Sequence, residues 1–249
     1  RYPDGILGKS FYQKNAPEFA PDWIRTEEIA SDGSGKITEY FVCDTPEALL
    51  YVANLGAIPL HVWSSRLGSL QHPDWCILDL DPKQAPFTHV VRVAREIHSL
   101  CRRIDLPCYP KTSGGDGLHV LIPLAGLLTY QQSRQLAELM ARILGQRLPE
   151  IATVARSLEA RDDKVYVDYV QNGYGKLLVA PFSVRPYAGA KVSTPLNWRE
   201  VTERLDPADF NIRSVPRRVK RQRSRLLEPI LDDTPDLTGA LARLYEELD

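Results

Sequence analysis

"CILDLDPK", residues 76–83, is an apolar run that contains two acidic residues, and the rest of the chain is interpreted from it. Successive side chains of a β-strand point to opposite faces, so Asp79 and Asp81 would share one face and Leu78 and Leu80 the other. Like charges side by side on a strand are destabilising, and a buried carboxylate needs a partner. Hard divalent cations such as Mg²⁺ prefer oxygen ligands, so converging carboxylates favour a metal site.

A third carboxylate lies in "VYVDYV", where Asp168 interrupts another apolar strand. Asp79, Asp81 and Asp168 together predict a site for two divalent ions. Two metals about 3.5–4 Å apart can clamp the attacking and leaving oxygens in phosphoryl chemistry. The alternative is that each aspartate pairs with an arginine or ends its strand, and Asp81, just before Pro82, is the clearest case for it.

A glycine-rich turn lies in "KTSGGDGLHV", residues 111–120. Gly114 and Gly115 allow backbone N–H groups to point into one concavity that suits phosphate oxygens. Ser113 adds a hydroxyl and His119 a ring donor. Any glycine-rich hairpin turn would look similar, but beside a metal site this one predicts the triphosphate of a nucleotide.

Further basic and aromatic residues are candidates with weaker signals. Lys176 and Arg185 flank the Asp168 strand and could neutralise phosphate charge, or they could be ordinary surface cations. His61 lies on a strand, where a histidine is more often structural. Aromatic residues among basic ones, the pattern of a nucleic-acid contact or of ordinary core packing, occur in "KSFYQK" as Phe11, Tyr12 and Lys14.

Composition limits the class of protein. The chain has 249 residues, 43% of them hydrophobic and 25% charged, which is ordinary for one large or two small globular domains. It has no apolar stretch long enough to span a membrane and four cysteines without a C-x-x-C pair, so we expect a reduced, cytoplasmic protein without a membrane partner. Net charge is −1, but residues 213–225 form a basic run next to an acidic tail, which indicates either a nucleic-acid contact or a solvated segment.

Local patterns predict the order of helices and strands. Capping residues and helical apolar spacing predict helices over 45–56, 87–104, 130–148 and 237–248. Strands are expected within 36–44, 57–65 and 74–82, a strand–turn–strand over 106–124, and a hairpin around Asn172-Gly173. We therefore expect a single α/β or α+β domain over residues 1–249, with mixed or antiparallel central sheets flanked by helices.

Several motifs in this order resemble one family, the polymerase domain of bacterial ATP-dependent DNA ligase D, in the archaeo-eukaryotic primase superfamily. The motifs are "RYPDG", "GKSFYQK", "ANLGAIPLHVW", "ILDLDP", "KTSGGDGLHV", "VDYVQNGYGK", "VAPFSVRP" and "STPLNW". The resemblance runs from Arg1 to about Ile212. It implies a primase-polymerase fold and a template-dependent nucleotidyltransferase that fills gaps and extends ends in non-homologous end joining.

The resemblance also implies partners and site residues. It implies Mn²⁺ or Mg²⁺ as two ions, ribonucleotides preferred over deoxyribonucleotides as substrates, and DNA ends or gapped duplex with a 5′-phosphate. Ku and ligase or nuclease modules are implied partners, and the bacterial nucleoid the implied location. Roles are carried over by motif: metal for Asp79, Asp81 and Asp168; nucleotide for His61, Ser113, Gly114, Gly115, His119, Lys176 and Arg185; DNA for Phe11, Tyr12, Lys14 and Arg25.

The chain departs from the family pattern in two places. It starts inside the "RYPDG" motif, without the preceding strands that supply lysines for the 5′-phosphate, so we expect altered end recognition. Asp116 stands in the glycine turn, where the family often has a basic or small residue, and should repel a triphosphate unless it turns to solvent or to a metal.

Two other functions are compatible with the same residues. An apolar strand that ends in D-x-D also resembles the opening motif of haloacid-dehalogenase phosphatases, which would leave the glycine turn and Asp168 unused. A non-catalytic module that binds DNA ends or a partner protein is the third possibility.

Overall fold

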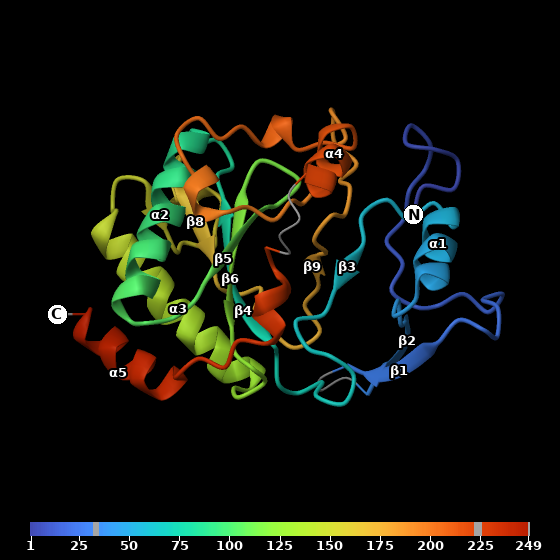
Figure 1. Ribbon diagram of the computed structural model, residues 1–249, viewed down its shortest axis with the longest axis horizontal. Coiled ribbons are helices and arrows are strands. Elements are labelled where there is room, and N and C mark those ends of the chain that lie inside the picture. Colours follow the sequence, from blue (N-terminus) through green and yellow to red (C-terminus); the bar gives the residue numbers. More distant parts are fainter. Residues whose placement is uncertain (32–34, 222–225, 249) are drawn as a thin grey trace. The chain divides into compact units, whose positions relative to one another are not determined.

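The computed structural model describes residues 1–31, 35–221 and 226–248, which belong to two compact units, 1–60 and 61–249 (Figure 1). The boundary falls within the stretch expected as one short strand, of which the observed strand, β3, takes only His61–Val62. That both units act as one catalytic domain stays a prediction. No helix in the described part of the chain is long and apolar enough to cross a membrane.

The first unit is a two-stranded antiparallel sheet and one helix. The strands are β1 (Thr26–Ala30) and β2 (Ile37–Phe41), paired along their whole length. Helix α1 (Pro46–Asn54) begins as predicted, because the Thr45 side chain accepts a hydrogen bond from the first turn and proline occupies the first helical position. It ends at Asn54 and is followed by Gly56, whose φ of +75° suits a glycine.

The second unit is built on a five-stranded sheet with the strand order β5-β6-β4-β8-β7. Neighbouring strands are antiparallel except for the parallel pair β7–β8, which confirms the predicted mixed sheet. The strands are β4 (Trp75–Asp81), β5 (Tyr109–Thr112), β6 (Leu118–Pro123), β7 (Ala152–Thr153) and β8 (Val165–Asp168).

Two amphipathic helices, α2 (Phe87–Arg103) and α3 (Tyr130–Arg147), cover one face of this sheet (Figure 1). Both were predicted within a residue or so of their observed ends. Leu78 and Leu80 of β4 are fully buried in the core that these helices form. Each such leucine contributes roughly 1.5–3 kcal/mol through the apolar area it removes from water. The opposite side chains of β4, including Asp79, therefore lie on the face away from the helices.

The remaining elements of the second unit are short. Strands β3 and β9 (Leu178–Val179) form a separate antiparallel pair. The other helices are α4 (Ser214–Arg221) and the predicted α5 (Leu237–Glu246), with 3₁₀ turns η1 (Glu159–Arg161), η2 (Trp198–Glu200), η3 (Pro207–Asp209) and η4 (Glu228–Leu231).

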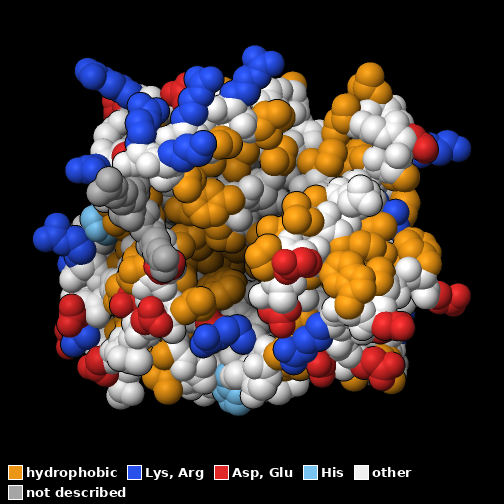
Figure 2. Space-filling view, turned by 45° about the vertical axis from the view of Figure 1, so that its right-hand side comes forward, with side chains coloured by type: hydrophobic (Ala, Val, Ile, Leu, Met, Phe, Trp, Pro, Cys, Tyr) orange, Lys and Arg blue, Asp and Glu red, His pale blue; other side chains and the backbone are white. Residues whose placement is uncertain are grey.

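Helix α4 takes up most of the described part of the basic run 213–225, of which 222–225 lie outside the described residues. Figure 2 shows Lys and Arg side chains gathered near the top of one face, at about the height of α4 in Figure 1.

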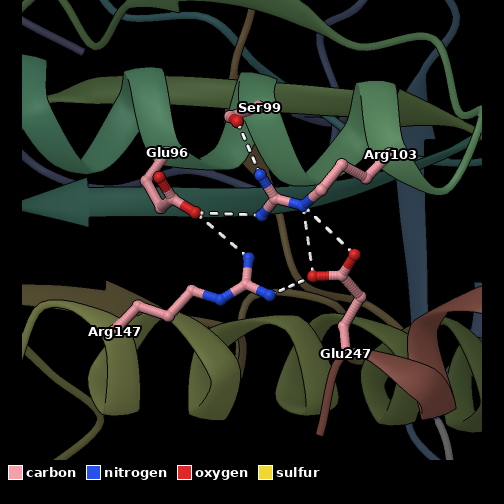
Figure 3. Close-up of polar contacts among 5 residues, drawn as sticks. All are labelled: Glu96, Ser99, Arg103, Arg147 and Glu247. Atoms are coloured by element: carbon pink, nitrogen blue, oxygen red, sulfur yellow. Dashed lines mark hydrogen bonds and ion pairs between the residues drawn. The ribbon is translucent and has the colours of Figure 1, made fainter.

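An ion-pair network ties the chain just after α5 to α2 and α3 (Figure 3). Arg103 binds Glu96 at 3.0 Å, Glu247 at 3.1 Å and the Ser99 hydroxyl at 2.7 Å. Arg147 binds Glu96 at 3.1 Å and also pairs with Glu247. Such partly exposed pairs contribute at most about 1 kcal/mol each. Here each of the two arginines contacts both glutamates, so the four side chains form one network.

The predicted hairpin around Asn172-Gly173 is wrong. Strands β8 and β9 flank this turn but do not pair with each other. Asn172 is instead buried, and its amide takes the place of a strand partner for β4: Oδ1 accepts from the Ile77 N–H at 2.8 Å, and Nδ2 donates to the Ile77 carbonyl at 2.7 Å. The turn preference of an Asn-Gly pair is a local signal, and here the hydrogen bonds from Asn172 to β4 outweigh it.

Candidate active site

A row of four ionisable side chains crosses the sheet on the face away from the helices. Lys111 of β5 is the register partner of His119 in β6, His119 that of Asp79 in β4, and Asp79 that of Asp168 in β8. Residues directly opposite in neighbouring strands point to the same face. The strand register therefore places the carboxylates of Asp79 and Asp168 next to each other and the two basic groups on one side of them.

The pKa values of the two carboxylates are shifted in opposite directions. Burial alone would raise the pKa of Asp79, but His119, with Nε2 3.4 Å from Oδ1, together with Lys111 and Arg185 lowers that pKa below its ordinary value. The pKa of Asp168 is raised, first by burial and further by the negative charge of Asp79. A pair of this kind is a common feature of functional sites.

These carboxylates open into a cavity of about 660 Å³. Seven of the ten residues predicted to bind metal or nucleotide line it: Asp79, Asp81, Ser113, Gly115, His119, Asp168 and Arg185. Asp116, noted from the sequence as a departure from the family pattern, also lines it. Other lining residues were not selected from the sequence: Lys83, Arg161, Tyr166, Gln171, Tyr187 and Lys191. For Tyr187 and Lys191, the sequence signal was that they closely follow Arg185, a predicted nucleotide residue in "FSVRP".

The glycine turn between β5 and β6 is closed around the Ser113 hydroxyl. Ser113 Oγ accepts from the N–H groups of Gly115 at 3.0 Å and Gly117 at 3.1 Å, so these N–H groups are engaged within the turn. The hydroxyl proton of Ser113 is still available as a donor. Gly114 has a φ of +75°, and a Cβ there would lie 2.7 Å from Arg185 Cγ, so only glycine lets the arginine pass over the turn.

Asp81 pairs with an arginine, which was the alternative to metal binding considered for it. Its Oδ2 accepts from Arg161 at 3.1 Å, and Arg161 in turn stacks 3.8 Å from the Tyr166 ring centroid. Within residues 1–31, 35–221 and 226–248, no three His, Cys, Asp or Glu side chains are grouped to hold a metal ion. The assignment of Asp79, Asp81 and Asp168 to metal stays a prediction. The adjacent oxygens of Asp79 and Asp168 are the donor type that a divalent ion prefers.

Three predicted nucleotide residues do not line the cavity. Gly114 lies in the glycine turn but contributes no surface to it. Lys176 is exposed in the turn before β9. His61 pairs with Val179 in the β3–β9 ladder.

The predicted DNA contacts are exposed residues of the first unit. Phe11 is half exposed and lies against the Arg1 guanidinium, 5.4 Å from its ring centroid, and Tyr12 is 64% exposed. Lys14 is exposed, and Arg25 pairs with Asp44 at 3.3 Å. Their role in binding DNA stays a prediction.

Lys111, which was not selected as a site residue from the sequence, is fully buried. Its ammonium donates to Ser193 Oγ at 2.6 Å and to the Val179 carbonyl at 3.2 Å, which joins β9 and the segment around Ser193 to the sheet. Burial lowers the pKa of Lys111 to about 7, against partial compensation by the charge of Asp79.

Comparison with known proteins places this chain in a family. The model of the LigD primase-polymerase domain matches residues 1–226. The bifunctional non-homologous end joining protein LigD of Bacillus subtilis is 36% identical over 89% of this chain, and the multifunctional LigD of Pseudomonas aeruginosa 32% over 88%. The chain spans only 36% and 26% of the length of these two relatives.

A solved structure agrees with the fold. The polymerase domain of Mycobacterium tuberculosis ligase D, in complex with DNA, matches with a TM-score of 0.83 and 29% identity, over 94% of this chain and 84% of that one. The predicted primase-polymerase fold is confirmed. The chain belongs to the LigD primase-polymerase domain family.

Proposed function

We propose that this chain is a template-dependent nucleotidyltransferase that fills gaps and extends ends in non-homologous end joining. The family implies nucleotidyl transfer in general, with a divalent metal and nucleoside triphosphates. The observation that carries the proposal is the adjacent pair Asp79 and Asp168, which opens into a cavity also lined by Arg185 and Lys191. The haloacid-dehalogenase alternative is wrong, because the family match covers most of the chain.

The carboxylates would hold the metal. Asp79 and Asp168 supply oxygens from adjacent strands, and Asp81 joins them by leaving Arg161. Divalent ions, when bound, lower the pKa of a primer 3′-OH and stabilise charge on the transferred phosphoryl group. The His119 ring beside Asp79 limits the rotation of that carboxylate and keeps it in its ionised form.

Other residues would bind the substrate. Arg185, Ser113 and His119 line the cavity, and the guanidinium of Arg185 and the hydroxyl of Ser113 can donate to phosphate oxygens. In the first unit, Phe11 and Tyr12 would stack on DNA, as aromatic residues do in single-strand contacts.

The finer parts of the proposal come from the family resemblance. They are ribonucleotide preference, two ions of Mn²⁺ or Mg²⁺, phosphate contacts by Lys14 and Arg25, nucleotide contacts by His61 and Lys176, a downstream 5′-phosphate, and Ku or ligase and nuclease modules as partners.

Primer extension on a gapped duplex with a downstream 5′-phosphate tests this function. We expect templated addition with Mn²⁺, faster with rNTPs than with dNTPs. Asp79→Asn should abolish addition while DNA binding survives, because it removes a charge at the proposed metal site and keeps the side-chain shape. Normal extension by Asp79→Asn would show that the site lies elsewhere.

A non-catalytic DNA-end-binding module is the second candidate. The Asp81–Arg161 pair favours it, because one of the three predicted metal ligands is engaged by a cation. Salt-dependent DNA binding with no product under any metal would support this candidate and contradict nucleotidyl transfer.

A further inference from the structure

A second pair of like charges faces the same cavity. Residues 184–192 form a hairpin, with a bridge between Val184 and Val192 and a hydrogen bond from the Arg185 N–H to the Lys191 carbonyl at 2.8 Å. Arg185 and Lys191 are therefore directly opposite each other, with side chains on one face. Both line the cavity that Asp79 also lines.

Two opposite cations destabilise a hairpin unless an anion compensates them. Lys191 has a compensating group, because its Nζ lies 2.6 Å from Asp116 Oδ1 in the glycine turn. Arg185 donates to the Tyr187 hydroxyl at 2.8 Å, and no ion pair of Arg185 occurs among the described residues. The hairpin thus presents more positive charge to the cavity than Asp116 alone neutralises.

The ion pair between Lys191 and Asp116 is weak. The Asp116 side chain is 81% exposed, whereas that of Lys191 is only 19% exposed. Water screens such a pair, so it contributes little to stability and can be exchanged for a stronger anion. Gly115, between these groups, also offers its carbonyl to Lys191 at 3.5 Å.

We propose that Lys191 binds the terminal phosphates of the incoming nucleotide together with Arg185, and that Asp116 holds Lys191 until the phosphates displace it. The inference rests on the proposed function and adds a residue to it. Asp116 then acts as a competitor within the chain. A triphosphate can replace it because several phosphate oxygens reach both cations, whereas a monophosphate offers too few. The carboxylate in the glycine turn is thereby directed at a lysine rather than at the substrate.

Binding of inorganic tripolyphosphate tests this subsite without requiring catalysis. We expect Lys191→Met to weaken binding and raise the dissociation constant about tenfold or more, as loss of a charge-assisted hydrogen bond predicts. Asp116→Asn should change it in the opposite direction, because the competitor is removed. Arg92→Met, a substitution of an exposed arginine on α2, should leave it unchanged and controls for net charge.

Steady-state kinetics provide the second readout. Lys191→Met should raise the KM for the nucleotide far more than it lowers kcat, and Lys191→Arg should restore most of the KM. If both Lys191→Met and Asp116→Asn weaken tripolyphosphate binding, or neither changes it, the exchange is refuted. If wild-type protein adds no nucleotide but still binds tripolyphosphate through Lys191, the subsite stands and the proposed function fails.

Discussion

Removal of the buried Lys111 charge should change how stability depends on pH. In the folded protein burial lowers the pKa of Lys111 from 10.5 to about 7. Between these two values the unfolded chain binds one more proton than the folded chain, so the free energy of unfolding rises with pH. The slope from this group approaches about 1.4 kcal/mol per pH unit.

The substitution Lys111→Met isolates this contribution. From about pH 7.5 to about pH 9, Lys111 should raise the stability of the wild type by roughly 2 kcal/mol, and the methionine variant should lack that rise. The absolute stability of the variant is less informative, because Ser193 keeps a hydrogen bond to the Thr112 carbonyl at 3.0 Å. Only the difference in slope reports the buried charge.

Urea unfolding at several pH values measures this difference. Each denaturation midpoint is converted to a free energy with the fitted slope, and wild type and variant are compared pH by pH. Lys220→Met serves as the control, because Lys220 is exposed on α4 and should leave the pH profile unchanged. Parallel profiles for wild type and Lys111→Met would refute the conclusion that Lys111 titrates near neutral pH.

Three further predictions concern metal binding, the glycine turn and the core. Millimolar Mn²⁺ should raise the melting temperature of the wild type by about 2–4 °C per kcal/mol of binding linkage, but not that of Asp79→Asn; equal shifts in differential scanning fluorimetry would contradict the site. Gly117→Ala should destabilise the protein by more than about 1 kcal/mol, because its Cβ would overlap the Leu80 carbonyl. Gly145→Ala, in open space on α3, should instead stabilise it by about 0.5–1 kcal/mol. Urea unfolding that ranks the two variants the other way would refute the packing argument. Leu80→Ala should cost about 2–5 kcal/mol in the same assay, and a cost below about 1 kcal/mol would mean that the sheet face is not tightly packed.

Local signals predicted most helices. Thr45 and Pro46 marked the start of α1, and apolar spacing outlined α2 and α3, because capping and amphipathic patterns act within a few residues. The pairing of the short strands was not predicted. β3 lies within the strand expected over 57–65 but takes only two residues, and β9 pairs with β3 rather than with β8.

The site was predictable in composition but not in arrangement. Asp79 and Asp168 could be selected because each interrupts an apolar strand, and His119 because it follows the glycine-rich turn. Their alignment depends on strand register, which is set by pairing across the sheet. The partner of Asp81 is Arg161, eighty positions away in the chain, and no spacing rule connects them. Asn172 shows the reverse error, since a strong turn signal was overridden by a tertiary hydrogen bond to β4.

Direct measurement of bound Mn²⁺ tests the central claim that the Asp79–Asp168 pair is a metal and nucleotide site. Electron paramagnetic resonance can count the bound ions in the presence of a non-hydrolysable nucleoside triphosphate. We expect Mn²⁺ bound by the wild type and by Asp116→Asn, and little or none by Asp79→Asn. Equal Mn²⁺ binding by wild type and Asp79→Asn would contradict the claim, since the ion would then be held by other residues.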